Sequence, residues 1–143
     1  MRKTVEKTIM TIDALNILNW LEQPDGFMSK VKLPIQVMWD LKDNIRFLTA
    51  IREKYHEFYP EIEKKYSDDA HSYEFEQKEE NGEMTIVRRV KDEFMEAFHK
   101  EKYDLLISET KYPVKVFNIE EFGDVEVGIQ DMNMLSFFME EQQ

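Results

Sequence analysis

Two Glu-x-x-His motifs, Glu53 with His56 and Glu96 with His99, have residue types that bind metal ions. Residues three apart on a helix project from one face. Di-iron carboxylate bundles carry this motif on each of two helices, with one further Glu from each of two others. Both motifs fall in the two long helical segments that the sequence predicts. A carboxylate–histidine metal protein is therefore one hypothesis.

The same motifs also fit solvent-exposed helix faces. Glutamate is so frequent, at 20 of the 143 residues, that its occurrence three positions before a histidine carries little information. Lys42, Thr49 and Glu63 are spaced at multiples of seven residues from His56, so they share its helix face, and all of them are polar. We therefore favour solvated side chains at both motifs and expect no bound metal or cofactor.

Other recognisable catalytic motifs are missing from the sequence. The four glycines are too scattered to form a phosphate-binding loop or a dinucleotide fingerprint. No serine lies in a Gly-x-Ser-x-Gly elbow, and cysteine is absent, which excludes disulfides, thiolate zinc sites and cysteine nucleophiles. Paired carboxylates such as Glu120 and Glu121 are expected in so acidic a chain. The sequence therefore predicts a protein without enzymatic activity.

The net charge of −11 is unevenly distributed. Residues 1–54 carry nine basic and seven acidic side chains, whereas residues 118–143 carry seven acids and no base. Such a chain repels a phosphate backbone, so we expect no direct nucleic-acid binding. The charge also permits an alternative function, in which an acidic protein mimics nucleic acid and inhibits a host nucleic-acid-binding enzyme.

The longest predicted helix spans residues 33–66. From Met38 onward, its apolar residues recur at alternating steps of three and four, the spacing of a coiled-coil seam. Beside this seam runs a second apolar stripe, formed by Val37, Phe47, Ile51 and Phe58. The helix is therefore apolar over more of its circumference than one partner helix covers. Pro60 is expected to kink or split it near Tyr59.

Shorter patterns predict the remaining elements. Before the long helix, the sequence predicts a strand over 4–10 and a helix from Thr11, with Thr11 as its cap. Residues 72–90 alternate around Asn81 and Gly82, which suit the positive φ angles of a tight hairpin turn. Further expected elements are a second long helix over 91–109, strands over 111–119 and 125–129, and a last helix capped by Asp131.

Together these elements predict an α+β protein dominated by a long antiparallel helical hairpin, with a small β element and a C-terminal helix. We expect a single domain over 1–143, with the β-hairpin at 72–90 inserted between the two long helices. The tail "MNMLSFFMEE" adds a methionine- and phenylalanine-rich stripe, which is typical of core and, less often, of surfaces that adapt to varied partners. The predicted interaction residues are Val37, Phe47, Ile51, Phe58, Met134 and Phe137.

These residues favour a function based on protein–protein contacts, with another protein or with further copies of the chain. No stretch approaches the eighteen or so apolar residues of a membrane span, so we expect no membrane association. The first ten residues have no apolar run behind their basic residues, and we expect no signal peptide.

Two motifs on the predicted helices can be compared with known sequences. The stretch "LPIQVMWDLKDNIRFL" begins the long helix, and "EFMEAFHKEKYDLLISE" forms the second. With the preceding "TIDALNILNWLEQ", they resemble a family of small uncharacterised proteins of tailed phages and prophages of Gram-positive bacteria, over roughly residues 9–140. The matching residues are Leu33, Pro34, Ile35, Val37, Leu41, Asn44, Phe98, Lys100, Glu101 and Leu105.

The chain departs from that family at three of the motif positions. Gln36 and Asp43 stand where the family has lysine, and His99 stands where it has asparagine. The resemblance implies a phage protein that works in the cytoplasm of a bacterial host or within a virion. It implies no catalytic residues.

Overall fold

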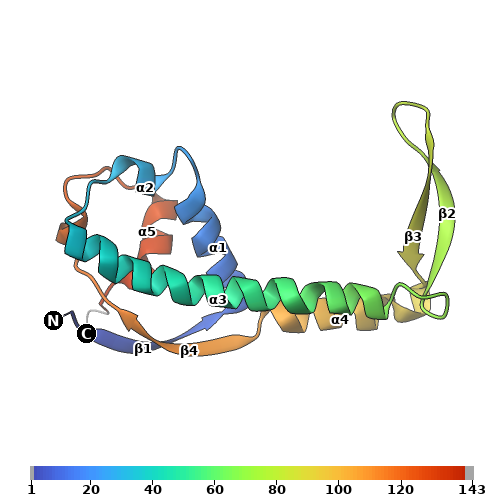
Figure 1. The fold of residues 1–143 in the computed structure, drawn as a ribbon, viewed down its shortest axis with the longest axis horizontal. Helices are drawn as coiled ribbons and strands as arrows, with labels where there is room; N and C mark the ends of the chain where they lie inside the picture. Colours follow the sequence, from blue (N-terminus) through green and yellow to red (C-terminus); the bar gives the residue numbers. More distant parts are fainter. Residues whose placement is uncertain (1, 141–143) are drawn as a thin grey trace. The chain divides into compact units, whose positions relative to one another are not determined.

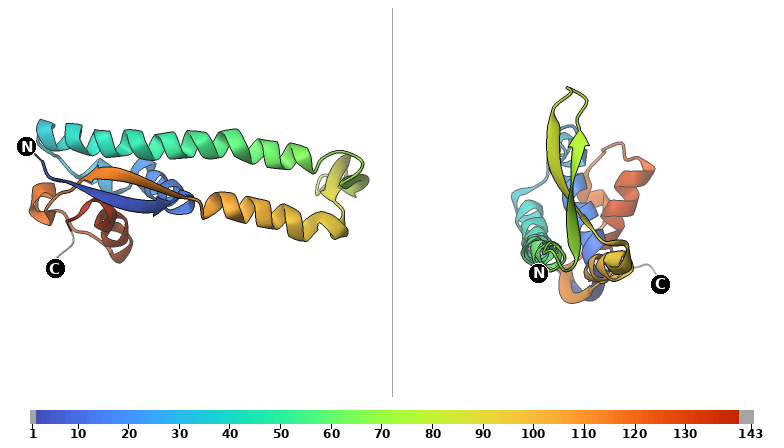
Figure 2. Two further views of the ribbon diagram at one scale, coloured as in Figure 1. Left: turned by 90° about the horizontal axis from the view of Figure 1, so that it is seen from below. Right: turned by 90° about the vertical axis from the view of Figure 1, so that its right-hand side faces the viewer.

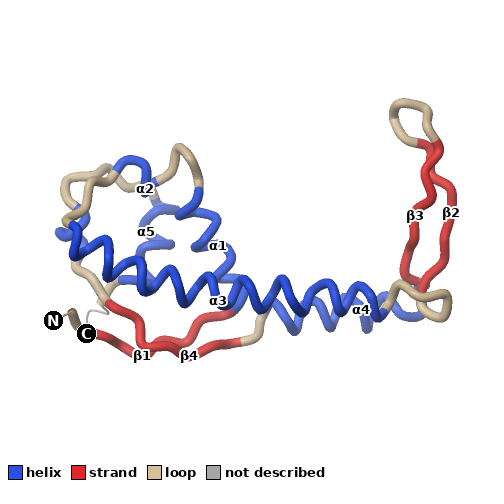
Figure 3. The backbone as a smooth tube through the Cα atoms, viewed as in Figure 1, coloured by secondary structure: helices blue, strands red, loops and turns tan. Residues whose placement is uncertain are grey.

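The computed structural model describes residues 2–140 and is α+β, as the sequence predicts (Figures 1 and 3). The chain forms two compact units. Unit 1 contains the described residues up to Glu53 and from Ser108 onward, and unit 2 contains Lys54–Ile107. The long helix α3, Ile35–Lys65, contributes its first part to unit 1 and its last part to unit 2.

Unit 1 surrounds the first part of α3 with a two-stranded ribbon and short helices (Figure 1). Its elements are β1 Thr4–Met10, α1 Thr11–Glu22, α2 Phe27–Lys30, β4 Glu109–Lys115, the 3-10 helix η1 Ile119–Phe122, α5 Ile129–Leu135 and the 3-10 helix η2 Ser136–Phe138. β1 and β4 pair antiparallel, from Thr4 opposite Lys115 to Met10 opposite Glu109. This pairing brings together segments that are about a hundred residues apart in the sequence.

The hydrophobic core lies in unit 1. Leu41 and Leu48 of α3 are fully buried against residues from both ends of the chain, including Leu18 of α1 and Phe138 of η2. Burying one such side chain stabilises the fold by about 2 kcal/mol. The seam predicted along α3 is therefore a core element over its first part.

Two predicted helix caps are wrong, because both residues lie inside their helices. Thr11 is the first residue of α1, and Met10 holds the cap position without a side-chain hydrogen bond. The Thr11 hydroxyl instead lies 2.8 Å from the Ser108 hydroxyl. Asp131 lies in the first turn of α5, where its carboxylate accepts the Gly128 N–H at 3.0 Å. A carboxylate there still complements the helix dipole.

The strand predicted over residues 125–129 is wrong. Residues 125–128 have no regular secondary structure, and α5 begins at Ile129.

Within residues 2–140, no helix combines the length and the apolar character that crossing a bilayer requires.

Unit 2 contains the end of α3, β2 Ser72–Lys78, β3 Met84–Val90 and α4 Asp92–Leu106. α4 runs back antiparallel beside the end of α3 (Figure 2). The helix α3 is continuous through Pro60, so the predicted split does not occur. The N–H that proline lacks would have bonded to the carbonyl four residues earlier, and the helix continues without that bond.

β2 and β3 form the predicted hairpin, with Ser72 opposite Val90 and Lys78 opposite Met84. Its turn differs from the prediction, because Gly82 has φ +87° but Asn81 does not have a positive φ. The Glu79 N–H bonds to the Glu83 carbonyl at 2.8 Å, and the Gly82 N–H bonds to the Glu79 carbonyl at 3.0 Å. Three residues therefore form the loop, and only its glycine needs a left-handed conformation.

Candidate interaction surface

The four candidate metal ligands, which the sequence already favours as solvated side chains, are all exposed: Glu53, His56, Glu96 and His99. Within residues 2–140, no group of three or more histidine, aspartate or glutamate side chains is placed to hold a metal ion. The spacing of the two motifs therefore does not correspond to a metal centre among the described residues.

Three of the predicted interaction residues lie in the core. Val37, Phe47 and Ile51 are only 7%, 9% and 6% exposed, and the Phe47 ring stacks on Tyr112 of β4 with centroids 3.8 Å apart. The sequence left open whether the chain itself covers this stripe, and at these three residues it does. The partners that cover this stripe are β4 and the other elements of unit 1, so these three side chains are covered within the chain. Ile35 and Trp39, at the start of α3, stay exposed.

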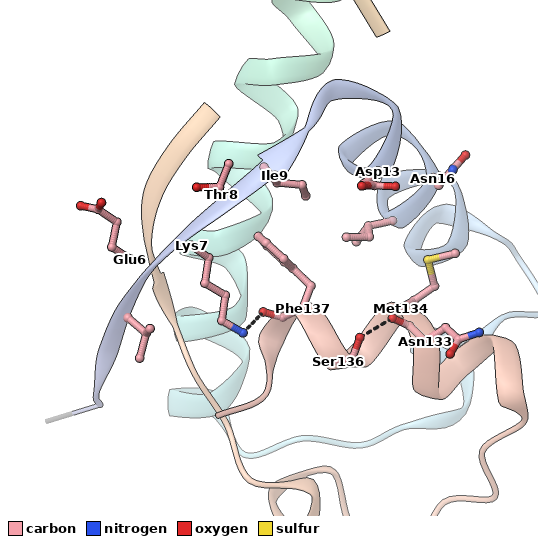
Figure 4. A pocket seen from close by; sticks show the side chains of 12 residues that line it. Glu6, Lys7, Thr8, Ile9, Asp13, Asn16, Asn133, Met134, Ser136 and Phe137 are labelled. Atoms are coloured by element: carbon pink, nitrogen blue, oxygen red, sulfur yellow. Dashed lines mark hydrogen bonds between the residues drawn. The ribbon is translucent and has the colours of Figure 1, made fainter. Parts of the chain in front are cut away.

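Met134 and Phe137 are half-buried and pack against the same core. They line a pocket of about 610 Å³ between β1, α1 and the α5–η2 segment (Figure 4). Lys7 of β1 points to the end of this segment, where its ammonium donates to the carbonyls of Phe137 at 2.9 Å and Met139 at 2.8 Å. The lysine therefore holds the C-terminal segment against β1.

A cluster of charged side chains links the two chain segments that form unit 1. Asp40 of α3 is buried and accepts a hydrogen bond from Arg2 at 2.7 Å and a weaker one from Lys115 at 3.4 Å. Arg2 also binds Glu121, and Lys115 binds Asp43 at 2.6 Å. The Arg2 guanidinium lowers the pKa of Asp40 and of Glu121 below their usual range. Since each charge has a partner of opposite sign, this arrangement fixes Arg2, the end of β4 and η1 to α3.

Acids of the base-free C-terminal segment have structural partners. Glu121 accepts the Asn118 N–H at 2.8 Å as well as binding Arg2. Asp131 accepts the indole N–H of Trp20 at 2.7 Å, which lowers the pKa of Asp131. Both carboxylates accept main-chain N–H groups of their own segments, and Glu121 also closes an ion pair, so these two acids do not require a surface that mimics nucleic acid.

The hairpin of unit 2 exposes apolar side chains on both of its faces. Because paired residues share a face and faces alternate along a strand, Tyr73, Phe75 and Val87 lie on one side and Met84 and Ile86 on the other. Met84 is 57% exposed and Ile86 is 72% exposed. Figure 1 shows the hairpin projecting from the helix ends that it joins.

Little of the hairpin is covered by the helices. Ser72, at its base, is the only residue of the two strands that is buried. An isolated two-stranded hairpin is marginally stable in water, and a third strand or a packed face is usually required. The hairpin therefore lacks the cover that such an element normally has.

The helices of unit 2 are also thinly packed. α4 has no buried residue. It contacts the last residue of α3 through the Lys65–Glu101 ion pair at 2.6 Å, and the turn that follows α3 through the Tyr66–Phe98 ring pair at 5.2 Å. Phe58, the fourth residue of the predicted apolar stripe, is 41% exposed, and Tyr103 of α4 is also exposed. Unlike the stripe in unit 1, this part of α3 retains free apolar surface.

A pocket of about 500 Å³ lies between the end of β3 and the facing sides of α3 and α4. We call it the corner pocket; its lining includes Tyr59, Lys64, Arg88, Arg89, Phe98 and Lys102. Among the described residues that line it, Glu63 is the only acid. Arg88 pairs with Asp69 at 3.1 Å and with Glu74 at 2.9 Å, and Arg89 lies 3.8 Å from Asp92. The lining basic groups that form no ion pair within residues 2–140 are Lys64 and Lys102, and they favour an acidic, partly apolar ligand.

The sequence did not identify the corner pocket. Its basic residues come from three elements, α3, β3 and α4, and lie far apart in the sequence. The only basic residues of the pocket that are adjacent in the sequence are the two arginines of "VRRV". The hairpin pattern predicts a strand there but does not predict a pocket.

Comparison of the chain with models of protein families, with curated proteins and with solved structures finds no match.

Proposed function

We propose that the protein acts without catalysis, by binding another protein chain through the hairpin and helices of unit 2. The observation that carries this proposal is the uncovered hairpin, with apolar side chains on both faces and only Ser72 buried. Exposed aromatic and methionine side chains in one region are typical of interaction sites. The free edges of β2 and β3 add unpaired main-chain groups, which pair readily with a further strand.

We further propose that the protein originates from a tailed phage or prophage and works in the host cytoplasm or in the virion. This part of the proposal is supported by the sequence motifs beginning at Leu33 and around Phe98, which resemble such a family. It is tested by mass spectrometry of infected bacteria. Detection in purified particles assigns the protein to the virion, and detection only in the cell fraction assigns it to the host.

Site-specific photocross-linking tests the binding surface. The photoreactive residue p-benzoylphenylalanine is placed at Phe75 or Ile86 on the hairpin, and at the exposed Lys111 of β4 as the control. The full-length protein is irradiated in bacterial cells, and its adducts are identified by mass spectrometry. We expect discrete adducts at both hairpin positions and none at Lys111. Absence of adducts at the hairpin, or the same adducts at all three positions, would overturn the proposal.

A further inference from the structure

The outer edge of β3 has a defined set of unpaired main-chain groups. In an antiparallel pair, residues that exchange hydrogen bonds alternate with residues whose N–H and C=O point outward. The bonds from Glu79 to Glu83 at 2.8 Å and from Lys91 to His71 at 2.9 Å fix this alternation at both ends of the hairpin. Val87 therefore bonds to Phe75, and Ile86 presents its main chain to the outer edge. The full outward set is Met84, Ile86, Arg88 and Val90.

We propose that two copies of this chain pair through their β3 strands, antiparallel about a two-fold axis at Val87. The inference rests on the proposed function of the hairpin and names its partner. In this register all seven residues of β3 overlap, and Ile86 of one copy lies opposite Arg88 of the other. The outward residues are then all in hydrogen-bonded pairs, as an antiparallel ladder requires. The result is one continuous four-stranded sheet.

The side chains in this register are compatible with close pairing. Since Phe75 lies opposite Val87 within each hairpin, the two-fold axis creates an apolar row of four: Phe75, Val87 and their two counterparts. The two central valines form a non-hydrogen-bonded pair, in which side chains approach most closely. No two like charges are directly opposite along β3.

The edge of β2 is less suitable for pairing with itself. Full overlap of two β2 strands about Phe75 would place Glu74 of each copy directly opposite Glu76 of the other. Like charges directly opposite on neighbouring strands are destabilising. The charge pattern of the hairpin therefore selects the β3 edge.

Charge complementarity gives a second reason to choose another copy of this chain. In the proposed register Met84 of the partner lies opposite Val90, which lines the corner pocket. The partner's hairpin turn follows at once, and its side chains include Glu79, Glu80 and Glu83. An acidic turn thus reaches a pocket in which Lys64 and Lys102 form no ion pair with the described residues of their own chain. By symmetry, each copy provides one turn and one pocket.

Sedimentation equilibrium of the full chain measures the dimerisation directly. Ile86→Pro removes an outward N–H and leaves the bonds within the hairpin intact, because proline is tolerated where the N–H faces solvent. Glu76→Pro is the matched control, since Glu76 is the partner of Ile86 across the hairpin and faces the outer edge of β2. We expect a wild-type dimer, a dissociation constant raised about tenfold or more by Ile86→Pro, and little change with Glu76→Pro.

A charge exchange tests the contact between the turn and the corner pocket. Glu83→Lys and Lys102→Glu are each expected to weaken the dimer about tenfold, because each places like charges together. The double variant is expected to restore affinity, since the pair is again of opposite sign. Additive weakening in the double variant would overturn the contact.

Other outcomes separate this inference from the proposed function. A wild-type chain that stays monomeric at all concentrations, or equal effects of the two proline variants, would overturn the pairing of copies. Amide hydrogen exchange at Phe75 and Val87 verifies that each proline variant keeps its hairpin. If photocross-linking at Ile86 then yields adducts with a different protein, the proposed function stands while the pairing of copies fails.

Discussion

The side-chain amide of Asn44 in α3 exchanges two hydrogen bonds with the main chain of Lys115 in β4. The Asn44 NH₂ donates to the Lys115 carbonyl at 2.8 Å, and the Lys115 N–H donates to the Asn44 carbonyl oxygen at 3.0 Å. Asn44 is almost completely buried. The main-chain N–H and carbonyl of Lys115 point away from β1, and the Asn44 side chain bonds to both of them as a third strand would.

Replacement of Asn44 should destabilise unit 1. Asn44→Ala leaves a buried N–H and a buried carbonyl unpaired, and each costs about 1–3 kcal/mol. We expect a total loss of about 3 kcal/mol in the free energy of unfolding, measured by urea denaturation. Asn44→Asp is the matched control for shape, and it should also destabilise because a carboxylate cannot donate to the Lys115 carbonyl. A loss below about 0.5 kcal/mol in both variants would contradict this role.

Asp40 should make stability depend on pH in acid. Arg2 lowers its pKa in the folded state below the usual value of about 3.9, so ionised Asp40 stabilises the fold above that pH. This contribution is lost as pH falls through the folded-state pKa. Asp40→Ala leaves the half-buried Arg2 without one acceptor, and we expect a cost of about 3 kcal/mol at pH 7. The cost should shrink below about pH 4.

Removing the whole ion pair provides the control for Asp40. The double variant Asp40→Leu with Arg2→Met should be less destabilised than Asp40→Ala alone, because it leaves no buried cation unpaired. Glu121 loses Arg2 but is partly exposed and keeps the Asn118 N–H. Denaturation curves at several pH values measure both effects. A cost for Asp40→Ala that does not change between pH 7 and pH 3 would show that the ion pair does not stabilise the fold.

Local patterns in the sequence predicted the elements well. The alternation of residues 72–90 around Gly82, and the helical spacing along α3, depend only on near neighbours in the chain. The α+β class and the C-terminal helix followed from the same patterns. The turn was less accurate, since a dipeptide such as Asn81-Gly82 fits both two-residue and three-residue loops.

Long-range pairing was not visible in the sequence and changed the functional prediction. The sequence did not show what covers the apolar stripe containing Phe47, because its cover, β4 with Tyr112, lies more than sixty residues away. Asn44 and Arg2 likewise find their partners far along the chain. The hairpin and α4 retain exposed apolar side chains, such as Ile86 and Tyr103. Unit 1 retains some as well, since Ile35, Trp39 and Ile129 are 67%, 56% and 84% exposed.

Gly82 should be required for the hairpin but not for unit 1. Its φ of +87° is unfavourable for any residue with a Cβ, although no atom lies within 4 Å of where that Cβ would be. We expect Gly82→Ala to destabilise the hairpin by about 1 kcal/mol. Amide hydrogen exchange should show faster exchange in β2 and β3 and unchanged exchange in β1. Unchanged exchange in the hairpin would contradict the assigned turn.

Tyr66 should control the stability of unit 2. Within residues 54–107, all of which the structure describes, it is the only large side chain that is buried. Its ring contacts Phe98 at 5.2 Å and His71 at 5.5 Å, so it joins the end of α3 to α4 and to the start of the hairpin. Tyr66→Ala removes this centre, and we expect a local loss of about 3 kcal/mol.

Hydrogen exchange distinguishes a local from a global effect of the Tyr66 change. Amides of α4 should lose protection in Tyr66→Ala while those of β4 keep it, because the core of unit 1 contains no residue of unit 2. Tyr66→Phe retains the ring and removes only the hydroxyl, whose pKa is raised by the neighbouring Glu101 carboxylate. It should therefore keep most of the protection. Equal loss of protection in β4 and α4 would mean that the two units unfold together.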